Sequence, residues 1–100
     1  MRYFVNMNGW QRDGNTKYKE FSNINDARKY AMGLAKKGVG RRNGYYEISI
    51  LTPYVGRNIG GSVSYHPAED RFIYRDEGVG KNKLLNKDGS TSNIPPRKRK

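Results

Sequence analysis

The sequence predicts a small α+β domain: a mainly antiparallel sheet in the order strand, strand, helix, strand, strand, strand, with one helix packed on it, then a disordered basic C-terminal tail. Three observations support this. The 100 residues suffice for one domain with a modest core. Several segments alternate apolar and polar residues, and one has apolar residues three and four apart. Apolar residues become rare after residue 78, so we expect the domain at 1–78 and a flexible tail at 79–100.

The first two strands are expected to form a hairpin. The opening "RYFVNM" places Tyr3, Val5 and Met7 on one face of a strand. The Asp-Gly pair at residues 13–14 favours the positive φ angles of a hairpin turn. The segment "TKYKEF" is then the returning strand.

Residues 24–37 are predicted to form the helix. Asn23 can cap its first turn, Asp26 lies near the positive end of the helix dipole, and Gly38 follows the last basic turn. The apolar side chains fall on one face at spacings of three and four. They are Ile24, Ala27, Tyr30, Ala31 and Leu34.

Three further strands are expected after the helix. In "YYEISIL", Tyr46, Ile48 and Ile50 share one face. The segment "TPYVGRNIGG" is expected to be a loop or irregular edge, because Pro53 and three glycines interrupt the pattern. The segment "SVSYHPAEDRFIYRDEG" predicts a hairpin that turns at "HPAED". Its core-facing residues are Val63, Tyr65, Phe72 and Tyr74, with Arg71 and Arg75 on the solvent face.

Composition restricts the chemistry that the chain can support. Without cysteine it has no disulfide and no thiolate metal site, and one histidine cannot build a zinc site. We therefore expect no metal and no cofactor. Neither a signal peptide nor a bilayer-spanning segment is expected, which favours an intracellular protein without membrane contact. The expected location is cytoplasmic or nucleoid-associated, or nuclear in a eukaryotic host.

The chain is strongly basic in both of its expected parts. It has 20 Lys and Arg against 9 Asp and Glu, a formal net charge of +11. Residues 81–100 contribute +6 of this excess, and residues 1–80 contribute +5. The expected tail therefore supplies about half of the charge, and the expected domain stays basic without it.

Six basic residues and no acidic residue lie between Ala27 and Tyr46. A helix-end and loop patch of this kind suits nucleic acid, because each neutralised phosphate releases condensed counterions. A simpler interpretation is also open, since basic residues at a helix C-terminus stabilise its dipole and often form only a solvated face. The six residues are Arg28, Lys29, Lys36, Lys37, Arg41 and Arg42.

Other side chains could add to such a binding surface. Tyr45 is predicted to face outward and could stack on an unpaired base, as could Trp10 and Tyr54 in loops. Arg71 and Arg75 would be available for phosphate. The final basic run suggests a localisation signal or a phosphate tether. It consists of Arg97, Lys98, Arg99 and Lys100.

The sequence favours a nonenzymatic protein that binds nucleic acid, DNA or RNA, through its phosphates. One alternative is a small inhibitor or adaptor that docks on an acidic protein surface, where the same charge would steer association. Another is a small toxin-like ribonuclease, with His66 as base, Glu69 as acid and Arg71 as phosphate clamp. No catalytic residue is assigned, because proline and acidic residues are ordinary turn formers.

Overall fold

The structure is a computed structural model, and it describes residues 2–8, 17–54, 57–76 and 80–94. These residues form one helix and a seven-stranded antiparallel sheet. The expected small α+β domain is confirmed. The elements are β1 (Tyr3–Asn6), β2 (Tyr18–Phe21), α1 (Ile24–Lys36), β3 (Tyr46–Tyr54), β4 (Arg57–His66), β5 (Arg71–Asp76), β6 (Lys81–Leu85) and β7 (Thr91–Ser92).

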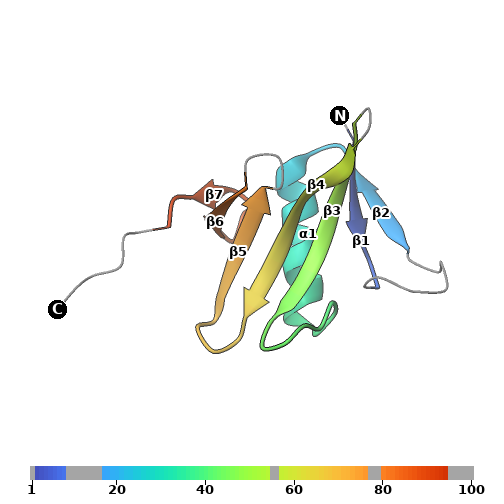
Figure 1. Ribbon diagram of the computed structural model, residues 1–100. Helices are drawn as coiled ribbons and strands as arrows, with labels where there is room; N and C mark the ends of the chain where they lie inside the picture. Colours follow the sequence, from blue (N-terminus) through green and yellow to red (C-terminus); the bar gives the residue numbers. More distant parts are fainter. Residues whose placement is uncertain (1, 9–16, 55–56, 77–79, 95–100) are drawn as a thin grey trace.

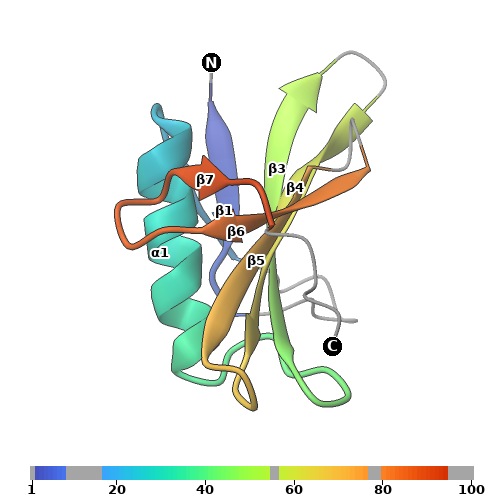
Figure 2. The ribbon, with the colours of Figure 1, turned by 90° about the vertical axis from the view of Figure 1, so that its left-hand side faces the viewer.

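The strand order is β2-β1-β3-β4-β5-β6-β7, and every neighbouring pair is antiparallel. Strands β3 to β7 therefore follow one another across the sheet in chain order. Strand β1 lies between β2 and β3, so α1 carries the chain from the edge strand β2 back to β3. The helix lies against one face of the sheet, as Figures 1 and 2 show from two directions.

The N-terminus of α1 is capped as the sequence predicted. The side-chain oxygen of Asn23 accepts hydrogen bonds from the backbone N–H groups of Asn25, at 2.8 Å, and Asp26, at 3.3 Å. Two of the N–H groups that have no partner inside the helix are thereby satisfied. The carboxylate of Asp26 also lies in the first turn, where the helix dipole favours negative charge.

The C-terminus of α1 ends in a Schellman motif. Gly38 has a φ of +99°, which a residue without a β-carbon adopts at little cost. Its N–H donates to the carbonyl of Ala35 at 3.1 Å, and the N–H of Val39 donates to that of Leu34 at 3.0 Å. The helix therefore stops at Lys36, one residue earlier than predicted, and the chain turns toward β3.

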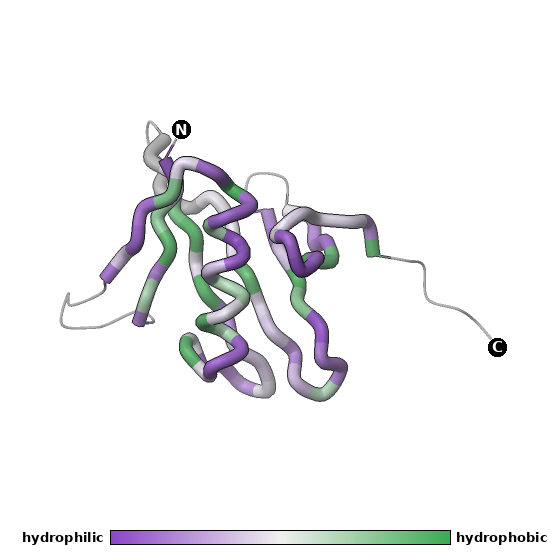
Figure 3. Tube along the Cα trace, turned by 180° about the vertical axis from the view of Figure 1, so that it is seen from behind, coloured by the Kyte–Doolittle hydropathy of each residue, from purple (hydrophilic) through white to green (hydrophobic). Residues whose placement is uncertain are grey.

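The core lies between α1 and the inner face of the sheet. Three fully buried alanines, Ala27, Ala31 and Ala35, let the helix approach the strands closely. The hydrophobic positions of the sheet lie behind α1 in Figure 3. The alternation predicted for the strands is confirmed except at Met7, which lies beyond the end of β1 and is 36% exposed. The other residues expected on this face are either buried or pack against the core. The largest fully buried side chains are Val5, Ile48, Ile50 and Val63.

The predicted strand order is incomplete, because the sheet continues past the domain end predicted at residue 78. Strand β6 pairs with β5, and β7 pairs with β6. Residues 81–85 and 91–92, which the sequence assigned to a disordered tail, are thus strands of the sheet. Leu85, only 8% exposed, joins the hydrophobic core and fixes β6 there. The final basic run at 97–100 lies outside the described residues.

The β6–β7 turn lies against the N-terminal half of α1. Gly89 has a φ of +87°, and a β-carbon at this position would collide with the backbone carbonyl of Asn25. This close approach explains why a segment with few apolar residues still packs on the domain.

A second difference concerns the segment expected to be a loop or irregular edge. Strand β3 runs to Tyr54 and β4 starts at Arg57, so most of that segment lies in these two strands. The pairing shifts register between Ile50 and Leu51 and again before Tyr54. Such bulges let a strand accommodate residues that break regular pairing. The predicted turn at residues 13–14 lies outside the described part of the chain.

Candidate functional site

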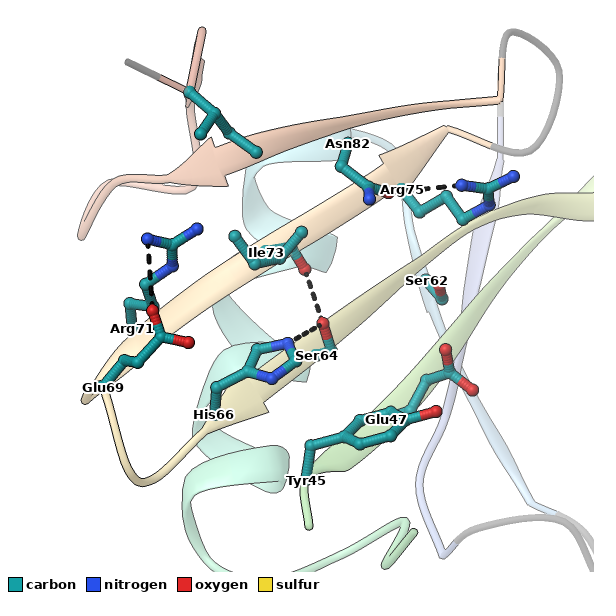
Figure 4. A pocket seen from close by; sticks show the side chains of 11 residues that line it. Tyr45, Glu47, Ser62, Ser64, His66, Glu69, Arg71, Ile73, Arg75 and Asn82 are labelled. Atoms are coloured by element: carbon teal, nitrogen blue, oxygen red, sulfur yellow. Dashed lines mark hydrogen bonds and ion pairs between the residues drawn. The ribbon is translucent and has the colours of Figure 1, made fainter. Parts of the chain in front are cut away.

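The sheet face opposite α1, here called the open face, carries a groove of about 320 Å³. The register of the strands explains which residues line the groove. Along each strand, residues that point into the core alternate with residues that point to this open side. Glu47 faces Ser64 across β3 and β4, and Ser62 faces Arg75 across β4 and β5. The groove is lined mainly by polar side chains from four strands, together with Tyr45, Ile73 and Ile94 (Figure 4).

The β4–β5 turn positions one end of the groove. The N–H of Glu69 donates to the carbonyl of His66 at 3.2 Å, and Asp70 adopts a positive φ of 49°. The hydroxyl of Tyr65 donates to Asp70 Oδ1 at 2.8 Å, and this bond raises the pKa of the phenol. His66 and Arg71 are consequently held as a cross-strand pair directly beside the turn.

His66 has its ring fixed by two contacts. Its Nε2 lies 3.0 Å from Ser64 Oγ, and Ser64 Oγ lies 3.3 Å from the carbonyl oxygen of Ile73, to which it can donate. When the single hydroxyl hydrogen goes to Ile73, Nε2 must carry a proton to donate to Ser64. The ring also stacks on Tyr45, with centroids 5.4 Å apart and planes 16° apart. Figure 4 shows both contacts inside the groove.

Two arginines on β5 lie on the same side of the sheet. Arg71 and Arg75 are four residues apart, which corresponds to about 13 Å along a strand. Arg71 Nη1 lies 3.4 Å from a carboxylate oxygen of Glu69, and Arg75 Nη1 donates to Asn82 Oδ1 at 3.4 Å. The predicted solvent-facing position of both arginines is confirmed, since both line the groove.

Four residues at the end of α1 and in the following loop form what we call the helix-end patch: Lys36, Lys37, Arg41 and Arg42. All four are exposed. Within the described part of the chain, Lys36, Lys37 and Arg41 take part in no ion pair. Arg42 differs, because its Nη2 lies 3.4 Å from a carboxylate oxygen of Glu47 in the groove.

The helix-end patch and the groove meet at one end of the molecule. The end of α1, the loop at residues 38–45 and the β4–β5 turn lie together at the lower end of Figures 1 and 2. The Tyr45–His66 stack and the Arg42–Glu47 ion pair both connect this loop to the groove. The patch and the turn that carries Arg71 therefore lie at the same end of the molecule, while Arg75 lies about 13 Å further along β5.

Two predicted binding residues lie elsewhere. The Arg28 guanidinium lies 4.2 Å from the centroid of the Tyr74 ring, and its Nη1 lies 3.4 Å from the carbonyl oxygen of Gly89. Arg28 therefore ties α1 to β5 and to the β6–β7 turn. Lys29 is exposed near Asp88, whose pKa is lowered mainly by hydrogen bonds with Ser90 and further by the charge of Lys29.

Several other sequence predictions can be placed only in part. Trp10 and the four basic residues at 97–100 lie outside the described residues, and so does the side chain of Tyr54. Conversely, sequence reasoning missed Ser62, Ser64 and Asn82, because isolated serine and asparagine residues carry no signal before strand register is known. The structure also brings His66, Glu69 and Arg71 into one groove.

Among the described residues, no group of three or more His, Cys, Asp or Glu residues is arranged to hold a metal ion. No helix in that part of the chain has the length and apolar character needed to cross a bilayer. The chain matches no protein-family model, no curated protein and no solved structure.

Proposed function

We propose that this protein binds nucleic acid without catalysing a reaction, by contacting phosphates through the helix-end patch. One observation carries the proposal: Lys36, Lys37 and Arg41 are exposed together, and within the described residues none has an ion-pair partner. Such cations can neutralise phosphates and release counterions without giving up an existing ion pair. The basic run at 97–100 would act as a second, tethered contact, on the basis of its charge alone.

A role in stabilising the helix would explain only some of the charges in the helix-end patch. Lys36 lies in the last turn of α1, where a cation interacts favourably with the helix dipole. That effect fades within one turn, so it does not account for Arg41 and Arg42 in the loop. A surplus of like charge also repels itself, which favours a role that requires a polyanionic partner.

Measuring affinity for random-sequence DNA and RNA across salt concentration tests the proposal. Replacing Lys36, Lys37 or Arg41 singly with Ala should weaken binding similarly on all sequences and reduce the magnitude of the salt slope by about 1. Lys87→Ala is the matched control, because Lys87 is exposed in the β6–β7 turn, outside the helix-end patch. The stability of each variant should change by less than about 1 kcal/mol.

Two results would end the proposal. The first is a folded variant with all four patch residues replaced by Ala that binds with unchanged affinity and salt slope. The second is a chain that binds no nucleic acid but retains a protein partner after nuclease treatment. The second result would favour docking on an acidic protein surface.

Ribonuclease activity is a second candidate, favoured by the shared placement of His66, Glu69 and Arg71 in the groove. His66 would accept the proton of a ribose 2′-hydroxyl as its oxygen attacks phosphorus. The 5′-oxygen would leave with a proton from Glu69 or water, giving a 2′,3′-cyclic phosphate. Arg71 would offset the developing charge. Cleavage of RNA but not of the same DNA strand, lost in His66→Ala, would establish this activity and replace the nonenzymatic proposal.

A further inference from the structure

We propose that the open-face groove binds an unpaired strand of nucleic acid, with one base on the Tyr45–His66 stack and the backbone following β5 between Arg71 and Arg75. The inference rests on the proposed function and goes beyond it. It assigns a second site, which contains residues outside the helix-end patch. It also assigns the strand type, single rather than double.

The stacked rings are the main reason to expect an unpaired base. Tyr45 and His66 are each half-buried, so part of each ring remains accessible in the groove. A base that stacks on an aromatic side chain gains affinity whatever its identity, because every base has a π face. Bases inside a duplex have these faces covered by adjacent base pairs. Only an unpaired base can therefore reach the rings.

The ring pair is held in place before any ligand arrives. Ser64 lies two residues before His66 on the same face of β4, and its Oγ is 3.0 Å from His66 Nε2, which fixes the imidazole. On the other side, the carbonyl of Tyr45 accepts a hydrogen bond from the N–H of Arg42 at 2.8 Å, which closes the loop before β3. Side chains already ordered by such contacts lose less conformational freedom on binding.

The rest of the groove suits a short stretch of one strand. Arg71 and Arg75 are about 13 Å apart along β5, with the buried side chain of Ile73 between them. Ser62 and Asn82 add a hydroxyl and an amide that can bond base edges or phosphates. A volume of about 320 Å³ lies at the low end for ligand pockets, which suits a nucleotide-sized unit rather than a duplex.

The charges of the groove distinguish its role from that of the helix-end patch. Glu47 and Glu69 each lie 3.4 Å from an arginine, Arg42 and Arg71 respectively. These ion pairs offset much of the positive charge around the groove. The helix-end patch therefore supplies most of the salt-dependent attraction, and the stacked rings supply the preference for unpaired bases.

The test measures binding of the full chain by fluorescence anisotropy to four labelled probes. These are a short single-stranded RNA, the same sequence as single-stranded DNA, the matching duplex, and an abasic strand that keeps the phosphates without bases. Tyr45→Ala should weaken binding of both single strands about five- to a hundredfold. It should leave the salt slope, the duplex and the abasic strand unchanged. Tyr45→Phe, which keeps the ring, should bind like the parent.

The helix-end patch provides the contrasting variant. Lys36→Ala should weaken all four probes and reduce the salt slope, because it removes a phosphate contact and no base contact. If Tyr45→Ala does not fold, Tyr45→Leu keeps an apolar side chain without a π face and should show the same selective loss.

Each remaining outcome contradicts one of the two proposals. If the Tyr45 variants bind single strands like the parent, or weaken all four probes equally, the groove proposal is wrong. The patch proposal then stands as long as Lys36→Ala lowers the salt slope. If none of the four probes binds, the proposed function itself is wrong.

Discussion

The two faces of the sheet use alternate residues of the same strands, and they differ in what those residues do. On the face covered by α1, Ile48 and its cross-strand partner Val63 are 1% and 0% exposed. One residue away on each strand, Glu47 and Ser64 line the groove on the open face. Packing therefore constrains one face strongly. The other face can carry polar side chains at little cost to stability, which leaves it available for binding.

The largest difference between the faces should appear with adjacent substitutions on β3. Ile48→Ala should lower the free energy of unfolding by about 2–5 kcal/mol, because it leaves a cavity beneath α1. Glu47→Ala should lower it by less than about 1 kcal/mol, since it removes only a partly exposed ion pair. Urea unfolding measures both values. Equal losses would contradict the division between the faces.

The same comparison extends to β6, where two neighbouring leucines point to opposite sides. Leu85→Ala should destabilise the protein by about 2–3 kcal/mol, because Leu85 belongs to the core under the helix. Leu84 pairs with Ile73 on the open face and is only half-buried, so Leu84→Ala should cost about 1 kcal/mol. Thermal unfolding can rank the two variants. A Leu85→Ala variant as stable as the parent would mean that β6 contributes nothing to the core.

A smaller effect should separate two glycines with nearly the same backbone conformation. Gly89 and Gly44 have φ angles of +87° and +90°, so replacement by Ala strains both positions similarly. Only at Gly89 would the new β-carbon collide with the carbonyl of Asn25, while Gly44 has open space around it. Gly89→Ala should therefore cost about 1 kcal/mol more than Gly44→Ala in urea unfolding. Equal costs would indicate that the β6–β7 turn does not press on α1.

The smallest effect concerns a polar group on the covered face and depends on pH. Burial raises the pKa of Tyr74 above its usual value of about 10. The folded state therefore favours the neutral phenol. The stability that Tyr74 contributes in this way is fully present below about pH 10, and it is lost as pH rises through the raised pKa of the folded state. Tyr74→Phe should lose less stability than the parent between about pH 9 and about pH 11. Tyr65→Phe is the comparison variant. The pKa of Tyr65 is also raised, but chiefly by a hydrogen bond with Asp70 at the surface rather than by burial.

Local pattern was sufficient for most of the fold. The helix could be predicted because its cap, its apolar stripe and its terminal glycine are all encoded within residues 23–38. The β4–β5 hairpin likewise follows from alternation on both sides of a turn sequence. Strands β6 and β7 could not be predicted in this way. Their attachment depends on Leu85 and on the contact between Arg28 and Gly89, 61 residues apart.

The candidate site was predictable only as a set of residue types. Charge counting identified Lys36, Lys37, Arg41 and Arg42, and alternation placed Arg71 and Arg75 on the solvent face. Neither signal indicates that the helix-end patch and Arg71 lie at the same end of the molecule. That proximity depends on the stacking of Tyr45 on His66, which requires both the loop after α1 and the register of β4.

The two edges of the sheet bear on self-association. Edge strands offer unpaired backbone groups to which another chain can add. Strand β7 has only two residues, Thr91–Ser92, which is too short to guide an incoming strand. On β2, Lys19 holds its ammonium group 5.9 Å from the ring centroid of Phe21 and 5.7 Å from that of Tyr30. A strand adding at this edge would have to pack beside that ammonium group, and a lysine on an edge strand disfavours such an addition.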